Sequence, residues 1–573
     1  MKRLTLILGL VVGCAHDQAA TTTTTPPPPA AEAKAEPQPV AAHDHGGAAP
    51  AQSAKLYDNL GNYHRAITTS VPEAQRWFDQ GLRLTYAFNH EEAGRSFEAA
   101  AARDPHCVAC WWGAALVLGP NYNQPAGAER SKKAMGFLAR AKAATAASPA
   151  TTPLERALVA ALAKRYADPP PAAGDDKAQS ALDEAYANAM RDVAKQFPAD
   201  DDVQVLFAES MMDLRPWRLW EPDGKPAPGT DEITGTLERV LARSPQHPGA
   251  NHYYIHAVEA SPHPERALAS ADRVGAMMPG AGHLVHMPSH VYERVGRYND
   301  AAEANRRAIA ADKKYTGSIG DPGYYAMYVA HNFQFLWAAA LMAGRGDESV
   351  AAARDMLKIV PAEMWKQMPE LSYSIATPAL SLVRFGRWKE VLDEPTPPAE
   401  LPIPTILYHY TRARALAALG KLDDAEAEAA AAEKVAATLA KGSMAGFAPA
   451  NAYVGVAIDL ARGDLACRRG KVADGLGRLK KAVAAHDEFP YAEPPDWYYP
   501  PRQTLAAWLL RTKKPGEAQR VLEEDLKKNP DNGWALSGLR EALRAQRKPT
   551  VGVEARLRKA WNAADAKLSS SDF

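Results

Sequence analysis

From Trp77 to Trp111 the chain reads WFDQGLRLTYAFNHEEAGRSFEAAAARDPHCVACW. The two tryptophans are 34 residues apart, and the residues that set helix packing follow Trp77 at offsets of 4, 16, 20, 23 and 28: Gly81, Ala93, Phe97, Ala100 and Pro105. Small residues let two helices approach closely, and a proline ends a helix because it lacks an N–H group and clashes with the preceding turn. The stretch therefore predicts two antiparallel helices, with a third beginning near Val108.

This spacing resembles the tetratricopeptide repeat (TPR), a 34-residue helix-turn-helix unit. One unit cannot bury its own apolar face, so we expect an all-α, TPR-like α-solenoid of about nine to eleven helix pairs over residues 55–573. Later units are marked by a glycine that ends the first helix: Gly296, Gly344, Gly386, Gly420 and Gly470. We also expect an insertion near residues 214–229 and a polar terminal cap from Val551 to Leu568.

The N-terminus reads as an export signal. Lys2 and Arg3 precede an apolar run that ends before Cys14, far shorter than the ~20 apolar residues of a membrane-spanning helix. The ending resembles a bacterial lipoprotein cleavage box. Residues 1–13 are therefore predicted to be a lipoprotein signal peptide and Cys14 the lipidated residue, carrying palmitate or a similar acyl chain; an ordinary signal peptide is the alternative.

Residues 14–54 are predicted to form a disordered tether, because their Thr, Pro and Ala runs cannot bury enough apolar surface to offset the entropy of ordering. Ala15 follows the cysteine, which by resemblance to sorting rules in Gram-negative bacteria favours the outer membrane. We therefore expect the protein in the bacterial cell envelope, attached to the membrane by its lipid anchor only.

The charge balance and the cysteines argue against two classes of function, nucleic-acid binding and covalent haem attachment. The chain has 67 basic and 67 acidic residues and a formal net charge of zero, which gives no support to nucleic-acid binding. Cys107 and Cys110 lie where one unit passes into the next. A structural disulfide, metal ligation and redox exchange all remain open for this pair, whereas covalent haem is disfavoured because Trp111 replaces the required histidine.

Several blocks carry a resemblance beyond the repeat: residues 104–113, 118–121, 251–261, 282–290, 331–332 and 493–497. Together they resemble a bacterial family of exported TPR proteins, over nearly all of residues 56 to 548. The resemblance implies the fold and no activity. The family pattern has a histidine where this chain has Gln334.

The histidines in two of these blocks form a candidate metal site. His252 and His256 are four residues apart and would share one helix face, with Glu259 one turn further on. Pro288 suits the first turn of a helix, which would place His286 just before the N-terminal end of that helix and His290 within it. Such imidazoles suit zinc or copper; the full candidate set is His252, His256, Glu259, His283, His286, His290 and His331. The alternative is a hydrogen-bonded polar groove, and without a His-Glu-x-x-His motif no hydrolytic mechanism follows.

A second set of candidates could line a groove by stacking on a ligand: Trp217, Trp220, Tyr253, Trp497, Tyr498 and Arg502. The alternative is aromatic packing that plugs the solenoid interior. The first functional hypothesis is thus an envelope lipoprotein whose concave groove binds a protein, a peptide or a small ligand. The second is a metal-binding protein or metal-dependent enzyme. Since the chain has no phosphate-binding loop, nucleophile elbow or paired-carboxylate motif, the sequence leans away from an enzyme without deciding the question.

Overall fold

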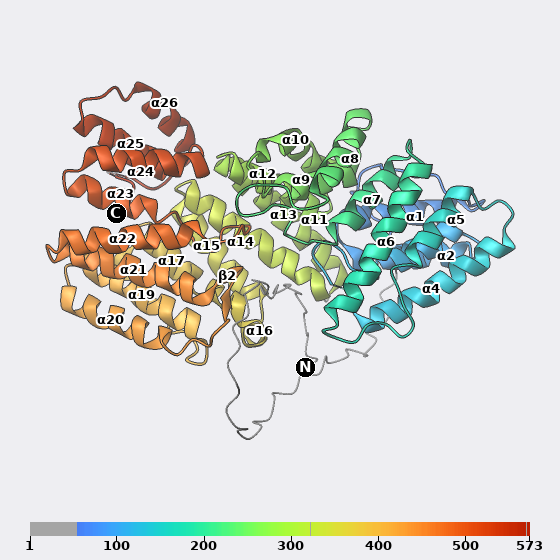
Figure 1. Ribbon diagram of the computed structural model, residues 1–573, viewed down its shortest axis with the longest axis horizontal. Helices are drawn as coiled ribbons and strands as arrows, with labels where there is room; N and C mark the ends of the chain where they lie inside the picture. The colour runs from blue at the N-terminus through green and yellow to red at the C-terminus, as the bar shows by residue number, and fades with distance from the viewer. Residues whose placement is uncertain (1–53, 126, 321, 569, 573) are drawn as a thin grey trace, which may run out of the picture.

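The computed structural model describes residues 54–125, 127–320, 322–568 and 570–572. The predicted signal peptide, Cys14 and all of the tether but Ala54 lie outside these residues. The described chain is helical almost throughout, and its helices pack in successive pairs along an elongated molecule (Figure 1). The predicted all-α, TPR-like solenoid is confirmed.

The N-terminal helices form one end of the molecule. They are α1 (Pro72–Tyr86), α2 (His90–Arg103), α3 (Val108–Leu116), α4 (Ala128–Ala147), α5 (Pro153–Leu162), α6 (Asp176–Gln196), α7 (Asp201–Met212) and α8 (Thr230–Arg243). Phe97 of α2 is fully buried between two glycines, because a Cβ at Gly81 or Gly113 would come within 2.6 Å of its ring. The repeat pattern around Trp77 therefore has a direct steric meaning. The expected insertion corresponds to the long connection between α7 and α8.

The middle of the chain contains shorter elements. They are α9 (Pro248–Val258), η1 (Pro264–Ala267), α10 (Leu268–Met277), α11 (Gly282–His286), α12 (Pro288–Arg294), α13 (Tyr298–Ile319), η2 (Gly323–Tyr325), α14 (Ala326–Met342) and α15 (Gly346–Ile359). Helices α11 and α12 act together as one broken helix, since both pack on α13. In Figure 1 this part lies between the two ends of the solenoid.

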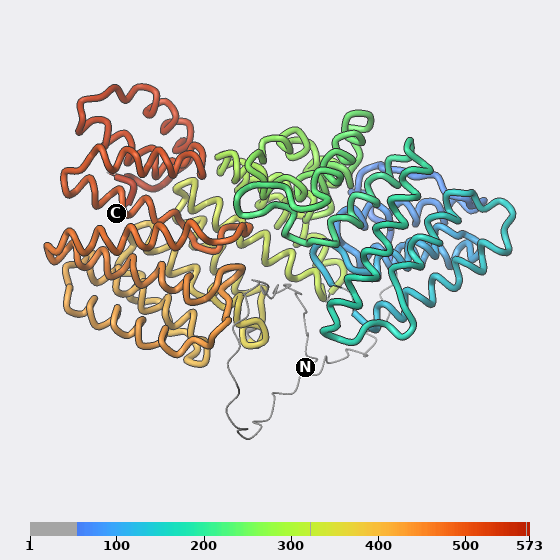
Figure 2. Tube along the Cα trace, viewed as in Figure 1, coloured from blue at the N-terminus to red at the C-terminus, as the bar shows by residue number. Residues whose placement is uncertain are grey.

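The C-terminal helices form the other end, and the tube in Figure 2 follows their hairpins one after another. They are α16 (Ala362–Gln367), η3 (Pro369–Ala376), α17 (Thr377–Arg384), α18 (Trp388–Asp393), α19 (Pro402–Ala418), α20 (Leu422–Ala436), α21 (Ala450–Arg468), α22 (Val472–Asp487), α23 (Arg502–Arg511), α24 (Pro515–Lys528), α25 (Gly533–Ala545) and α26 (Val551–Ala560). Two-residue strands β1 (Met444–Ala445) and β2 (Ala448–Pro449) pair antiparallel before α21. Helix α26 buries none of its residues, as expected of a polar terminal cap.

Counted in this way, the described helices make twelve pairs, with α16 outside the pairing, against the nine to eleven that the sequence predicted. The estimate was low because pairs such as α9 with α10 lack the consensus spacing.

The five predicted helix-ending glycines all adopt left-handed backbone conformations, with φ between 67° and 80°. One buried apolar cluster runs along the solenoid from Leu60 to Ala542. Among the helices of the described residues, none is long and apolar enough to cross a membrane.

The last described residues fold back onto the solenoid. Asp572 lies between Arg384 of α17 and Arg414 of α19, with its carboxylate 3.7 Å and 3.2 Å from their guanidinium nitrogens. All three side chains are buried. The C-terminal tail is therefore part of the packed structure.

Candidate metal centre

Helix α9 brings two histidines to one face. The His247 side chain caps its first turn by accepting a hydrogen bond from the Ala250 N–H at 3.2 Å, and Pro248 follows at the first helical position. His252 and His256, one helical turn apart, point the same way, and their ring centroids are 4.9 Å apart. Glu259 ends the helix and is buried.

Helices α11 and α12 supply three more histidines. Pro288 occupies the first position of α12, His286 is the last residue of α11, and His290 lies within α12, as predicted from the position of the proline. His283 and His286 lie on one side of α11, with ring centroids 5.9 Å apart. The break between the two helices thus places the rings of His283 and His290 against histidines of α9, and the ring of His286 between them.

The remaining groups come from distant parts of the chain. His331 is on α14, and Glu493 is in the Pro-rich loop between α22 and α23, 203 residues from His290. His331 is partly buried; the other five histidines and both glutamates are buried. Every histidine of the predicted set therefore lies in one interior cluster, together with Glu259.

The first histidine set consists of His252, His256 and His283, whose candidate ligand atoms all lie within 4.8 Å of one another. The Nδ1–H of His252 donates to the main-chain carbonyl of Tyr86 at 2.7 Å. Because a carbonyl only accepts hydrogen bonds, this contact fixes the proton on Nδ1 of a neutral ring and leaves the Nε2 lone pair free. That Nε2 faces the Nε2 of His283 at 3.1 Å.

The second histidine set consists of His286, His290 and His331, whose candidate ligand atoms also lie within 4.8 Å of one another. The Nδ1–H of His286 donates to Oδ1 of Asn305 at 2.7 Å, and the Asn305 amide is itself held because its Nδ2 donates to a main-chain carbonyl. The Nε2 atoms of His286 and His290 face each other at 2.6 Å. The two sets therefore repeat one arrangement.

Two carboxylates stand behind these rings. Glu259 accepts from Nδ1 of His256 at 2.8 Å through one oxygen and from Nδ1 of His290 at 2.5 Å through the other. Glu493 accepts from Nδ1 of His290 at 2.7 Å. The four residues form a third group of candidate ligands, which we call the mixed group (His256, Glu259, His290 and Glu493).

The electrostatics keep most of the imidazoles neutral. Burial lowers the pKa of His256 to about 3 and that of His331 to about 4. Burial and the neighbouring imidazoles hold the pKa values of His252, His283 and His286 well below the usual range. Burial would also lower the pKa of His290, but the carboxylates of Glu493 and Glu259 outweigh it and raise the pKa to about 10. Five of the six rings are therefore in the state that binds a metal.

Three polar atoms of the cluster have no hydrogen-bond partner within the described part of the chain: Nε2 of His256, Nδ1 of His283 and Oε1 of Glu493. A buried polar atom left without a partner costs about 1–3 kcal/mol. A metal ion at the first set would satisfy Nε2 of His256.

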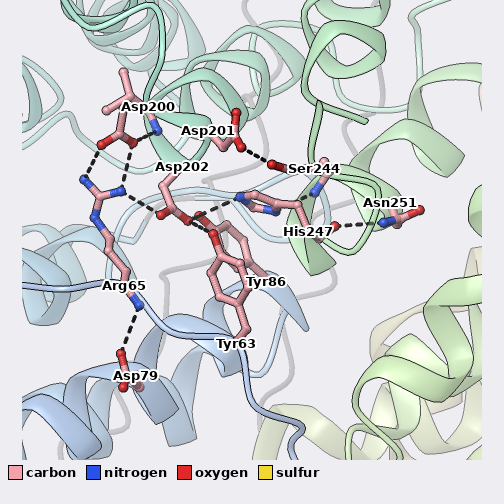
Figure 3. A network of polar contacts seen from close by, with 12 residues as sticks. Tyr63, Arg65, Asp79, Tyr86, Asp200, Asp201, Asp202, Ser244, His247 and Asn251 are labelled. Atoms are coloured by element: carbon pink, nitrogen blue, oxygen red, sulfur yellow. Dashed lines mark hydrogen bonds and ion pairs between the residues drawn. The ribbon is translucent and has the colours of Figure 1, made fainter. Parts of the chain in front are cut away.

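A polar network fixes the start of α9 against the N-terminal helices (Figure 3). Asp202 of α7 accepts from the Tyr63 and Tyr86 hydroxyls at 2.8 and 2.5 Å and from Arg65 at 2.6 Å, and lies 3.3 Å from the His247 ring. Burial would raise the pKa of Asp202, but the contacts to His247 and Arg65 outweigh it and hold the pKa well below its usual range. Tyr86 thus holds Asp202 through its hydroxyl and His252 through its carbonyl, so the network sets the position of the first histidine.

The predicted groove residues lie mostly in the core. Tyr253, Trp497 and Tyr498 are buried, and Arg502 is buried in an ion pair with Asp487. These placements correspond to the packing alternative.

The two tryptophans of the 213–229 connection are partly buried. Trp220 donates to the Ala257 carbonyl at 2.8 Å, and Trp217 stacks on Tyr122 beside His256, at centroid distances of 5.2 and 6.0 Å. Clefts of about 420 and 670 Å³ lie elsewhere, near Tyr57 and near Trp112, and none of the groove candidates lines them. A groove ligand stays a prediction, whereas Trp217 belongs to the wall of the histidine cluster.

The structure joins Cys107 and Cys110 in a disulfide at the start of α3, with Cys107 also capping the helix by accepting from the Cys110 N–H. This arrangement corresponds to the structural role among the three left open. Cys467 is the free cysteine of the described chain and is buried.

Sequence reasoning missed three members of the centre. Glu493 stands at the start of the block 493–497, which contributes to the family resemblance. The sequence therefore marked this block but gave no sign that Glu493 contacts the histidines. Asn305 and the Tyr86 carbonyl left no sequence signal, because an outer hydrogen bond to an imidazole depends only on how the helices pack. Gln334, where the resemblance led us to expect a histidine, donates to the Tyr373 hydroxyl at 3.1 Å.

No family model and no curated protein matches the chain. Among solved structures, a human IFIT1 dimer with m7Gppp-AAAA is similar at 11% identity and a TM-score of 0.30, covering 85% of this chain and 96% of that one. Yeast Tom70 is similar at 11% identity and a TM-score of 0.26, covering 83% and 90%. The functional assignment therefore rests on the site itself.

Proposed function

We propose that this protein binds transition metal ions at the buried cluster of six histidines and two glutamates. One observation carries the proposal: in each histidine set, two Nε2 atoms approach head to head while an outer Nδ1–H is held by an oxygen acceptor. Metal-binding histidines have this arrangement, because the outer hydrogen bond fixes the ring and leaves the inner nitrogen as the ligand.

The donor set points to borderline metals. Imidazole nitrogens suit zinc, copper, iron and nickel, and affinity among divalent first-row ions is highest for copper. The first coordination shell would consist mainly of neutral imidazoles, with the carboxylates orienting two of them from behind. Zinc and copper are therefore the ions to test first, as the sequence already indicated.

The competing interpretation is a polar core held by hydrogen bonds alone. It explains the outer contacts of His252 and His286 but leaves Nε2 of His256 and Oε1 of Glu493 without partners in the described chain. In it, His283 would donate its Nε2–H to Nε2 of His252, and His290 would donate its Nε2–H to Nε2 of His286. Metal binding also accounts for the facing nitrogens, and it alone supplies a partner for Nε2 of His256.

The test is metal analysis of protein purified without an affinity tag, before and after soaking in zinc or copper followed by gel filtration. At least about one equivalent is expected, with loss in a His252→Asn, His286→Asn double variant. The matched control is His263→Ala, an exposed histidine between α9 and α10. Less than about a tenth of an equivalent in soaked wild type, with helical circular dichroism intact, would overturn the proposal.

We also propose that the protein is exported and lipid-anchored through Cys14, in the outer membrane of a bacterial envelope. The disulfide between Cys107 and Cys110 supports an exported location, because disulfides persist in oxidising compartments. Labelling with a lipid precursor should tag wild type and not Cys14→Ser. Equal labelling of the two would contradict the anchor. Binding of an envelope protein, peptide or small ligand to the solenoid surface remains a further proposal.

A further inference from the structure

We infer that the centre holds two metal ions side by side, one on each histidine set. This inference rests on the proposed function and extends it from metal binding to a defined dinuclear site. The first ion would be bound by His252, His256 and His283, and the second by His286, His290 and His331.

The two sets have no member in common, so both can be filled at once. Within the first set the ring centroids are 4.9, 4.9 and 6.1 Å apart, and within the second they are 4.6, 4.9 and 6.0 Å apart. Three imidazoles at these spacings can each direct one nitrogen to a common ion.

The sets are also adjacent. Ring centroids of His256 and His290 are 5.5 Å apart, and those of His283 and His286 are 5.9 Å apart, similar to the spacings inside each set. Glu259 joins them from behind, since one of its oxygens accepts from His256 and the other from His290. A single carboxylate therefore orients one ligand of each ion, which suits a pair of ions better than two independent sites.

A one-ion arrangement is available in the mixed group and competes with this inference. It would use the carboxylates as direct ligands and leave His252, His283, His286 and His331 outside the coordination shell. It would give no ligand role to the facing Nε2 atoms at 3.1 and 2.6 Å. It would also share His256 and His290 with the two histidine sets, so the mixed group cannot simply add a third, independent ion.

The ligand count indicates what the pair can accept. Three imidazoles leave at least one position open on a four-coordinate ion. Two divalent ions carry four positive charges, and Glu259 and Glu493 together supply at most two negative ones. The excess positive charge would favour binding of a small anion, such as hydroxide, at the open positions.

The experiment counts copper ions in single-site variants that preserve the outer hydrogen bonds. His252→Asn removes Nε2 but keeps an amide N–H that can donate to the Tyr86 carbonyl, and His286→Asn does the same toward Asn305. Glu493→Gln removes a carboxylate ligand from the mixed group, while its amide oxygen can still accept from Nδ1 of His290. Each variant is loaded with copper sulfate, freed of excess metal by gel filtration and analysed for bound copper, with helical circular dichroism as the folding check and His263→Ala as the control.

Wild type and His263→Ala are expected to hold about two equivalents and each asparagine variant about one. Glu493→Gln, which keeps an oxygen acceptor for His290, should still hold more than about one equivalent. If one asparagine variant fails to fold, the other together with Glu493→Gln still decides between the arrangements. One equivalent in wild type that survives both asparagine changes and disappears in Glu493→Gln would overturn the two-ion inference while leaving metal binding intact. No bound copper or zinc in folded wild type would overturn both.

Discussion

Replacing Gly81 with alanine is expected to destabilise the first repeat, although alanine is the better helix former. A Cβ at Gly81 would lie 2.6 Å from Cε1 and 2.7 Å from Cδ1 of the buried Phe97 ring. The ring has little room to move away, because it also packs directly on the backbone of Gly113, where a Cβ would lie 2.6 Å from the same two ring atoms. Overpacking of this kind costs about 1–3 kcal/mol.

Part of that cost is offset. Alanine stabilises a helix interior by about 0.5–1 kcal/mol relative to glycine. Combining the overpacking cost with this gain gives an expected net loss of about 1 kcal/mol, within a range of about 0–2.5 kcal/mol. Gly136 of α4 provides the matched control, because it is exposed and a Cβ there meets nothing within 4 Å. Gly136→Ala should stabilise the protein by about 0.5–1 kcal/mol, so the two substitutions differ in sign.

The assay is hydrogen exchange of the slowest amides of α1 and α2 for Gly81→Ala, and of α4 for Gly136→Ala. It reports the local opening free energy even if the solenoid unfolds in parts. Making Gly81→Ala in a Phe97→Leu background removes the ring and should bring the effect of the alanine close to that of the control. If Gly81→Ala is as harmless as Gly136→Ala in wild type, or if Phe97→Leu brings no relief, the steric reasoning is refuted.

Three further predictions concern the buried carboxylate Asp202, the disulfide and the C-terminal tail. Asp202→Asn should lower the free energy of unfolding by about 1.5–3 kcal/mol at neutral pH. Because the pKa of Asp202 is depressed in the folded protein, its stabilisation is present above the ordinary carboxylate pKa and is lost as the pH falls through the folded value. The urea midpoints of variant and wild type should therefore converge in acid, and a constant difference down to pH 2 would contradict this. A Cys107→Ser, Cys110→Ser variant should lose at most about 2 kcal/mol because the closed loop is short, and reductant should lower the unfolding midpoint of wild type only; an equal response of both proteins would exclude the disulfide. Asp572→Ala should lower the free energy of unfolding by about 3 kcal/mol, because it leaves two buried arginines with fewer acceptors. Amide hydrogen exchange in α17 and α19 should become faster, and unchanged exchange there would show that the tail does not stabilise these helices.

Local spacing was enough to predict the helix pairs and the histidine pairs within them. His252 with His256, and the placement of His286 and His290 around Pro288, follow from the 3.6-residue helical period and the geometry of proline, both of which act over a few residues. The number of repeats was underestimated because pairs without consensus glycines leave no local signal.

The burial of the predicted groove residues, in contrast, could not be predicted from local spacing. Trp497 and Tyr498 stand in a Pro-rich stretch that reads as an exposed loop, yet both are buried. The sequence shows that an aromatic side chain is present but not which neighbouring repeat covers it. Burial in a solenoid is decided by the packing of helices from successive repeats, and both alternatives were compatible with the residues alone.

The sequence by itself determined an all-α solenoid, the shared face of His252 and His256, and the donor chemistry of an imidazole-rich site, since each depends on residues close together in the chain. Only the tertiary structure decided that six histidines meet in two sets of three, that Glu493 reaches them from 203 residues away, and that Tyr86 and Asn305 hold the outer nitrogens. Those contacts join segments whose separation along the chain has no relation to their distance in space. They are set by how the repeats stack, and this stacking decides which nitrogens are free to bind a metal.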